Sequence, residues 1–205
     1  MTCIAIIAAK GPSSAKTRLS AALPRTTKRR LVEVMLQRVI AAAADANAIS
    51  EVVLVTPVAG LQARGCAIVE DRGEGPNGAF ACGVRYAASR GHTHAVLLPS
   101  DLALVTVADV GAIVDEGGCS GAVIAQDKLG AGTNGLFVPL GIPIEFRFGA
   151  QSSVLHADEF RRVGLSVTFI DRVVLAADVD EPEDLELLKG VPGYEFLNSL
   201  EWSIA

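Results

Sequence analysis

The stretch Ala5–Ser20, AIIAAKGPSSAKTRLS, joins an apolar run to a loop of small residues that ends in the basic residues Lys16 and Arg18. The apolar run has the length and residue types of a buried strand, so we expect the loop to lie at the carboxyl end of that strand. Small residues at that position can expose backbone N–H groups, and open α/β sheets bind ligands at this edge. Lys16 and Arg18 add positive charge suited to a triphosphate; a solvated basic loop is the alternative.

This loop does not match the P-loop motif Gly-x-x-x-x-Gly-Lys-Ser/Thr. When Lys16 and Thr17 are aligned to the end of the motif, Lys10 and Ala15 stand at its two glycine positions. The expectation of a phosphate site therefore rests on the position of the loop at a strand end and on its charge.

Further apolar runs predict the fold class. They have strand length, and most are bounded by Gly, Pro or Asp: Cys3–Ala9, Val52–Val55, Ala95–Leu98, Ala122–Ala125, Leu136–Val138 and Val167–Ile170. Helical patterns lie between them, at Lys28–Ala46, Gly78–Ser89, Val107–Glu116, Ser152–Arg162 and Glu183–Leu188. Near-continuous apolar strands imply burial on both faces, and this alternation predicts an α/β three-layer sandwich with a mainly parallel sheet. Because two runs in the second half are separated only by a loop, we expect an antiparallel strand that makes the sheet mixed.

The length of 205 residues suits one domain, which we place at residues 1–190. We expect residues 191–205, with the single Trp202, to pack as a tail on the body or on a second subunit, which also allows a homodimer. Apolar runs fall short of the ~18 residues of a membrane helix, and no signal-peptide pattern is present, so we expect a cytoplasmic protein. The four cysteines are far apart, which argues against a zinc ribbon and a disulfide framework.

Charge is unevenly distributed along the chain. The net charge of −5 argues against nucleic acid as a partner. Residues Lys10–Arg30 include seven basic and no acidic side chains, whereas Asp171–Glu186 includes seven acidic side chains and one Arg. The first segment favours an anionic ligand, and the second could hold a cation.

Three aspartates are candidate metal ligands. Asp101 follows the run Ala95–Leu98 after a Pro-Ser turn, and Asp178 and Asp180 are two residues apart, so their side chains share one face of an extended backbone. Carboxylates at a strand end suit Mg²⁺, which prefers hard oxygen ligands. Asp101 and Asp180 could instead cap the helices that follow them.

Five stretches together carry a family resemblance. Besides Ala5–Ser20 they are GEGPNGAF (73–80), LLPSDLALV (97–105), GTNGLFV (132–138) with FRFGAQSS (146–153), and AADVDEPEDL (176–185). In this order and content the chain resembles the CofC/FbiD family of guanylyltransferases, over about Ile4 to Leu188. The resemblance implies a Rossmann-like nucleotidyltransferase fold, shared with the molybdenum-cofactor guanylyltransferases.

The resemblance also implies an activity. Members transfer GMP from GTP to a three-carbon phosphoacid, with release of pyrophosphate, in the biosynthesis of coenzyme F420. Phosphoenolpyruvate, 2-phospho-L-lactate and 3-phospho-D-glycerate are the candidate acceptors, and the product would pass to the next enzyme of that pathway. A nucleotidyltransferase for a larger cofactor or sugar phosphate, or a non-catalytic nucleotide-binding protein, is the alternative.

The resemblance assigns roles to particular residues. It implies catalytic roles for Lys16, Arg18 and Asp101, and it implies that Asp101, Asp178 and Asp180 bind Mg²⁺. The residues implied to bind the nucleotide are Ala8, Lys16, Gly75, Asn77 and Ser100. Those implied to bind the phosphoacid are Thr133, Asn134, Gly149 and Ser152. Asn77 and Ser152 could instead be helix N-caps. Pro76 departs from the aliphatic residue expected beside the guanine, which leaves the strictness of the GTP preference open.

Two further residues have open roles. Arg147 either neutralises the carboxylate of the acceptor or forms a structural ion pair. His156 falls within the predicted helix Ser152–Arg162, where we expect it to face solvent.

Overall fold

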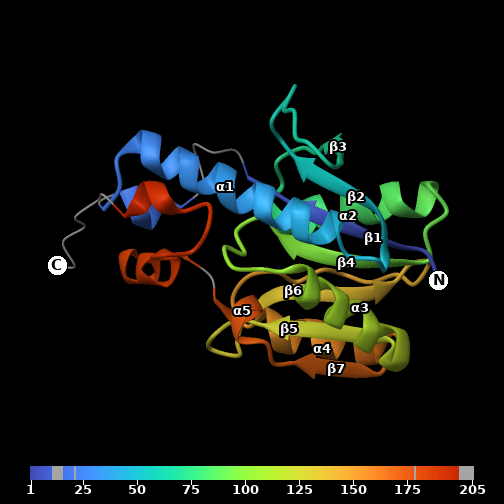
Figure 1. Ribbon diagram of the computed structural model, residues 1–205. Coiled ribbons are helices and arrows are strands. Elements are labelled where there is room, and N and C mark those ends of the chain that lie inside the picture. The colour runs from blue at the N-terminus through green and yellow to red at the C-terminus, as the bar shows by residue number, and fades with distance from the viewer. Residues whose placement is uncertain (11–15, 21, 178, 199–205) are drawn as a thin grey trace.

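The computed structural model describes residues 1–10, 16–20, 22–177 and 179–198. Within these ranges one seven-stranded sheet is covered by helices on both faces (Figure 1). The strands are β1 (Cys3–Ala8), β2 (Ile49–Thr56), β3 (Ala67–Glu70), β4 (His94–Pro99), β5 (Ala122–Gln126), β6 (Thr133–Pro139) and β7 (Val167–Ile170). The α-helices are α1 (Arg25–Ala44), α2 (Gly75–Ser89), α3 (Val107–Ser120), α4 (Ser152–Arg162) and α5 (Val173–Ala176), and the 3₁₀ segments are η1 (Thr17–Ser20), η2 (Pro182–Leu188) and η3 (Glu195–Leu197).

The sheet has the strand order β3-β2-β1-β4-β6-β5-β7. Strands β1 to β4 pair in parallel, β6 is antiparallel to both β4 and β5, and β7 is parallel to β5. The predicted mixed, mainly parallel α/β sheet is confirmed, and β6 is the reversed strand.

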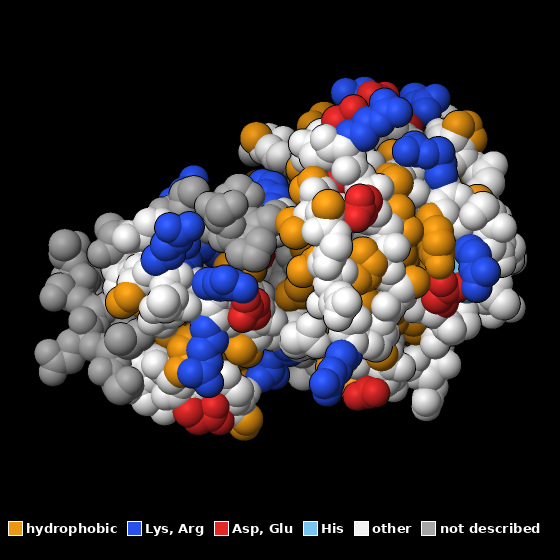
Figure 2. Space-filling view, turned by 90° about the horizontal axis from the view of Figure 1, so that it is seen from above, with side chains coloured by type: hydrophobic (Ala, Val, Ile, Leu, Met, Phe, Trp, Pro, Cys, Tyr) orange, Lys and Arg blue, Asp and Glu red, His pale blue; other side chains and the backbone are white. Residues whose placement is uncertain are grey.

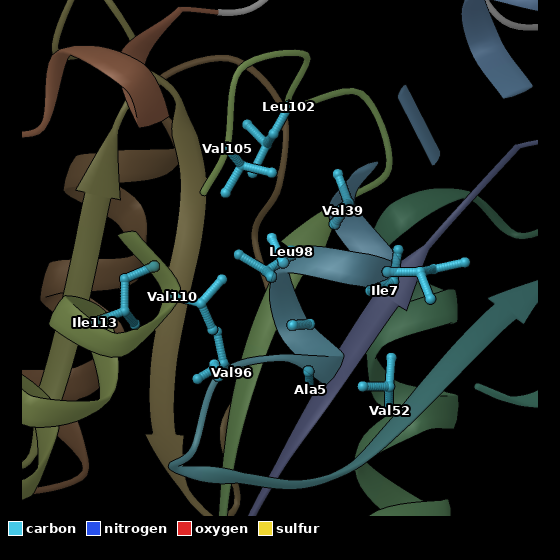
Figure 3. Close-up of a cluster of buried hydrophobic side chains, with 14 of the residues drawn as sticks. Ala5, Ile7, Val39, Val52, Val96, Leu98, Leu102, Val105, Val110 and Ile113 are labelled. Atoms are coloured by element: carbon cyan, nitrogen blue, oxygen red, sulfur yellow. The ribbon is translucent and has the colours of Figure 1, made fainter. Parts of the chain in front are cut away.

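Alternation along the strands separates two buried layers. In β1, Cys3, Ala5 and Ile7 face the layer that holds α1 and α3, and Figure 3 shows Ala5 and Ile7 there beside Val39 and Val52. Ile4 and Ile6 face the opposite layer, which holds α2 and α4. Since both faces of β1 are covered, the strand is apolar throughout, as its sequence predicts.

A third apolar cluster fixes the described part of the tail. Leu31 and Met35 of α1 pack with Leu185 and Leu188 of η2 and with Tyr194. The Tyr194 hydroxyl is buried and donates to the carbonyl oxygen of Ala103 at 2.8 Å. Residues 191–198 therefore pack on the body of the protein, whereas Trp202 lies outside the described residues.

Several elements differ from the prediction. Strand β3 is absent from the prediction, although residues 66–69 are apolar; it lies at the edge of the sheet and is half-buried. Residues Glu183–Leu188, predicted as an α-helix, form a 3₁₀ segment that begins at Pro182. None of the described helices combines the length and apolar character needed to cross a bilayer.

Helix α3 runs four residues beyond its predicted end at Glu116. Within this extension, Gly117 has a packing role. A Cβ atom at Gly117 would overlap the ring of Phe137 in β6, so the glycine lets the helix approach the sheet closely.

Candidate active site

A cavity of about 560 Å³ opens where β1 and β4 end. The strand order turns here, because β2 lies on one side of β1 and β4 on the other. Open α/β sheets bind ligands at such a point. Since β6 is antiparallel to β4, its amino end reaches the same edge, and Thr133 and Asn134 line the cavity. Residues far apart in the sequence therefore meet around one space.

Most of the residues predicted to act in the site line this cavity. Those that do are Ala8, Lys16, Arg18, Gly75, Ser100, Asp101, Thr133, Asn134 and Asp180. Asn77, Gly149 and Ser152 are not part of the lining formed by the described residues. The structure thus brings together the end of β1, the turn after β4 and the acidic segment before η2.

Lys16 is held between two carboxylates at the edge of the cavity. Its Nζ donates to Oδ2 of Asp101 at 2.7 Å and to Oδ1 of Asp180 at 2.6 Å. The Lys16 side chain is only 4% exposed, whereas the two carboxylate side chains are 39% and 48% exposed. Burial lowers the pKa of Lys16, but the two carboxylates outweigh burial and raise the pKa above its ordinary value. The ammonium is therefore charged, and a solvated basic loop is the wrong interpretation for Lys16.

The backbone of Lys16 is also unusual. Its φ of +53° lies in the left-handed region, which residues with a side chain seldom adopt. Such a conformation persists where surrounding contacts determine it, and here the two ion pairs hold the side chain inward.

Neither Asp101 nor Asp180 caps a helix. Helix α3 has Thr106 at its N-cap, and η2 has Glu181 at that position. The capping alternative is therefore wrong for both aspartates, whose side chains point to Lys16 instead.

The basic and acidic segments of the sequence meet at this edge. Arg18 Nη1 donates to Oε1 of Glu181 at 2.8 Å, with both side chains substantially exposed. Exposed pairs of this kind contribute about 0–1 kcal/mol to stability. Figure 2 shows acidic and basic side chains beside one another across the face seen from above. Arg18 remains available to an anion in the cavity that it lines.

A metal site is only partly described. Asp178, the third predicted ligand, lies outside the described residues. Among the residues that the structure does describe, no group of three or more His, Cys, Asp and Glu side chains could hold a metal ion. What the structure gives is a pair, Asp101 and Asp180, whose oxygens converge on one cationic atom.

Two aromatic rings form another part of the cavity lining. Phe80 and Phe148 both line the cavity, and their rings stack with centroids 4.5 Å apart. Helix α2 begins at Gly75, with Pro76 in its first turn, so the helix starts at the cavity rather than after a longer loop. Gly75 has a φ of +82°, a conformation that a glycine adopts without strain.

Asn77 supports this part of the lining. Its amide oxygen accepts from the backbone N–H of Phe148 at 2.6 Å, and its amide nitrogen donates to the Phe148 carbonyl oxygen at 3.3 Å. Both groups of the amide are engaged with Phe148, so Asn77 positions Phe148. The N-cap alternative is wrong, since Glu74 holds that position.

The predicted phosphoacid residues divide into two groups. Thr133 and Asn134, at the amino end of β6, line the cavity. Ser152 is the first residue of α4 and only 2% exposed, and it does not line the cavity. Its N-cap alternative is wrong, because Gln151 occupies the N-cap.

Arg147 forms an ion pair within the protein, as one of its two predicted roles requires. Its Nη2 donates to Oε2 of Glu145 at 2.8 Å.

His156 is the residue that the sequence analysis missed. It is fully buried, so the expectation that it faces solvent is wrong. Its Nδ1 lies 3.1 Å from the Thr133 hydroxyl, and its Nε2 accepts from the backbone N–H of Arg147 at 2.9 Å. The available signal was spacing: His156 lies four residues before the buried Phe160, on the same face of α4.

Comparisons with known sequences show the family of the chain. The family described as "Guanylyl transferase CofC like" matches residues 2–205. The chain is 36% identical to the 3-phospho-D-glycerate guanylyltransferase of Phenylobacterium zucineum, covering 92% of this chain and 91% of the relative. It is 34% identical to the phosphoenolpyruvate guanylyltransferase of Rubrobacter xylanophilus (96% and 98% covered) and 32% identical to the 2-phospho-L-lactate guanylyltransferase of Methanothermobacter thermautotrophicus (99% and 92% covered).

Solved structures agree on the fold. A putative nucleotide-diphospho-sugar transferase from Desulfovibrio desulfuricans G20 superposes with a TM-score of 0.79 at 17% identity, covering 97% of this chain and 95% of that one. CMP:2-keto-3-deoxy-manno-octonic acid synthetase, solved with CTP, gives a TM-score of 0.61 at 12% identity, with 95% and 100% covered. The chain therefore has the nucleotidyltransferase fold.

Proposed function

The chain belongs to the CofC-like guanylyl transferase family, and from this premise we propose that it transfers GMP from GTP to the phosphate of a three-carbon phosphoacid, releasing pyrophosphate. The named acceptors of its relatives are 3-phospho-D-glycerate, phosphoenolpyruvate and 2-phospho-L-lactate, and we propose that the acceptor here is one of these. We place the enzyme in the cytoplasm and its product in the biosynthesis of coenzyme F420.

The cluster of Lys16, Asp101 and Asp180 is the observation that supports this proposal most directly. A buried ammonium and two partly exposed carboxylates face a cavity at the switch point of an α/β sheet. Phosphoryl and nucleotidyl transfer depend mainly on positioning and on charge stabilisation, and this cluster provides both kinds of group in one place.

The described carboxylates fit a divalent cation. Oδ2 of Asp101 and Oδ1 of Asp180 both lie within 2.7 Å of Lys16 Nζ, so two hard oxygen ligands already converge on a single positive charge. We propose that these two residues, with Asp178, hold Mg²⁺. When bound, Mg²⁺ neutralises part of the charge of the triphosphate.

Residues of the chain supply the rest of the chemistry. An oxygen of the acceptor phosphate attacks the α-phosphorus of GTP in line, and the bond from the α-phosphorus to the leaving pyrophosphate breaks. Lys16 and Arg18 line the cavity, so we place their charges beside the oxygens on which negative charge grows. No side chain has to form a covalent intermediate, because the acceptor is itself the nucleophile.

The two substrates would occupy different walls. We propose that Ala8, Gly75 and Ser100 contact the nucleotide, since they come from the end of β1, the start of α2 and the turn after β4. Thr133 and Asn134 come from β6 and suit the small anionic acceptor.

An acceptor panel tests the proposal. The protein is incubated with GTP and Mg²⁺ and with each of the three phosphoacids separately, and both pyrophosphate release and the mass of the guanylylated product are measured. We expect one acceptor to be preferred, and CTP or ATP in place of GTP to react more slowly. Binding of GTP without turnover on any acceptor would instead favour a non-catalytic nucleotide-binding protein, and turnover only with a larger sugar phosphate would favour the related transferase class.

A further inference from the structure

His156 joins two segments behind the acceptor wall, the part of the cavity formed by Thr133 and Asn134. Its Nε2 accepts from the backbone N–H of Arg147, and its Nδ1 contacts the hydroxyl of Thr133. The ring packs edge-on against Phe148, with centroids 4.7 Å apart, and stacks on Phe160 at 6.1 Å. Two hydrogen bonds and two aromatic neighbours therefore fix both its position and its orientation.

These contacts also fix its tautomer. A backbone N–H can only donate, so the Nε2 atom that faces Arg147 carries no proton. Burial lowers the pKa of His156 to about 4, with Glu159 acting in the opposite direction, so the imidazole is neutral near pH 7. Its single proton is then on Nδ1, which donates to the Thr133 hydroxyl oxygen at 3.1 Å.

A hydroxyl that accepts this bond keeps its own proton to donate. Thr133 lines the cavity, and within the part of the chain that the structure describes its hydroxyl has no other hydrogen-bond partner. We propose that His156 is a positioning residue that makes the Thr133 hydroxyl a dedicated donor toward an anionic oxygen of the phosphoacid. This inference rests on the function proposed above.

The physical gain is preorganisation. A free hydroxyl can either donate or accept, whereas ionised carboxylates and phosphates only accept. With Nδ1–H of His156 directed at its oxygen, Thr133 has its proton available to the cavity before the acceptor arrives. The acceptor then gains a charge-assisted hydrogen bond without reorganisation of the wall.

Two substitutions separate this role from a structural one. In His156→Gln the side-chain amide can reach the position of Nε2 and accept from Arg147, but nothing donates to Thr133. In His156→Asn the amide can reach the position of Nδ1 and donate to Thr133, but the Arg147 N–H loses its partner. We expect His156→Gln to raise the KM for the phosphoacid roughly tenfold with little change in the KM for GTP, and His156→Asn to stay nearer the wild type.

A double-mutant cycle tests whether His156 acts through Thr133. Thr133→Val removes the hydroxyl, and Thr133→Ser is its matched control, which keeps it. We expect Thr133→Val to raise the phosphoacid KM, and His156→Gln to add little in the Thr133→Val background, because the group that it orients is gone. In the Thr133→Ser background, His156→Gln should retain its full effect.

The outcomes are distinguishable. A wild-type protein that uses no phosphoacid contradicts the proposed function itself. An active wild type in which His156→Asn is the more damaged variant, or in which the effects of His156→Gln and Thr133→Val are additive, overturns the positioning role and assigns His156 to holding the Arg147 segment. Thermal unfolding of each variant shows whether loss of folding accounts for a change, and a His156→Gln variant that unfolds near the wild-type temperature yet keeps the wild-type KM for the phosphoacid also overturns the inference.

Discussion

The Nζ atom of Lys16 lies 2.6 Å from Oδ1 of Asp180, a residue 164 positions later in the chain. This contact joins the basic loop after β1 to the acidic segment before η2, and Asp101 completes the cluster from the turn after β4. Lys16 occupies the two oxygens that we assign to a divalent cation. Lys16 must therefore release them when metal and nucleotide enter, and the phosphates of the nucleotide are its natural new partners.

Substitution of Lys16 by Met should separate metal binding from catalysis. Without the competing ammonium, we expect Mn²⁺ to bind the nucleotide-free protein roughly tenfold more tightly, while kcat/KM falls by about 10²–10³ because a charge-stabilising group is lost. Electron paramagnetic resonance of free Mn²⁺ measures the affinity. Arg18→Met is the matched control, because Arg18 pairs with Glu181 rather than with the two aspartates, and its Mn²⁺ affinity should match the wild type. Unchanged affinity in Lys16→Met would falsify the assignment of Asp101 and Asp180 to the metal.

Replacement of Asp180 by Asn should affect turnover far more than folding. The Asp180 side chain is 48% exposed, and the buried Lys16 ammonium keeps Asp101 as a partner in this variant, whereas loss of a metal ligand should lower kcat at least roughly 100-fold. Glu183→Gln, an exposed carboxylate on the same segment, should leave both turnover and melting temperature near the wild type. A marked fall in the melting temperature of Asp180→Asn would identify a structural acid instead.

Stability should fall as the pH is lowered from about 6.5 to about 4. Burial holds the pKa of His156 at about 4 in the folded protein, below the ordinary value of 6.5, so in this window the unfolded chain binds a proton that the folded chain does not. The contribution is full above pH 6.5 and is lost toward pH 4, by a total of about 3 kcal/mol at about 1.4 kcal/mol for each unit of pKa difference. Urea unfolding at pH 7, 5.5 and 4.5 measures the loss. His156→Phe should show a shallower pH dependence, and an equal dependence in both proteins would contradict the assignment.

The two glycines near the end of α3 should respond in opposite ways to alanine. A Cβ atom at Gly117 would overlap the Phe137 ring, so we expect Gly117→Ala to destabilise the protein by about 1–3 kcal/mol. Gly118 has open space around its Cβ position, and Gly118→Ala should be neutral or stabilising by up to about 1 kcal/mol through helix propensity. Chemical denaturation of both variants gives the comparison, and equal effects would show that the packing of α3 on β6 is looser than described.

Most of the sheet could be predicted from sequence because its central strands are buried on both faces. Runs such as Cys3–Ala9 and Ala95–Leu98 are apolar throughout, as expected for strands of a sheet that is covered on both faces. Strand β3 was missed although residues 66–69 are apolar; it pairs only with β2 at the edge of the sheet, where its residues are half-buried or exposed. The end of α3 was misplaced since the reason for Gly117 is Phe137, a residue 20 positions later.

The candidate site was predictable where it depends on strand ends. Lys16, Asp101 and Asp180 follow or precede recognisable elements, so their approach to one edge could be argued from the topology. The roles of Asn77 and His156 could not, because each depends on the backbone of the segment around Phe148, which folds over α2 and α4 only in the tertiary structure. Helical spacing could place His156 on the buried face of α4, but it could not predict its hydrogen bonds to Thr133 and to the backbone of Arg147.

The reversed direction of β6 has a consequence for how the family can diversify. We assign the nucleotide contacts to the first half of the chain and the acceptor contacts to β6, which is antiparallel to β4 and so brings Thr133 and Asn134 to the cavity from the second half. Exchanging residues 133–156 between relatives of different acceptor preference should therefore transfer the acceptor preference and leave the binding of GTP unchanged.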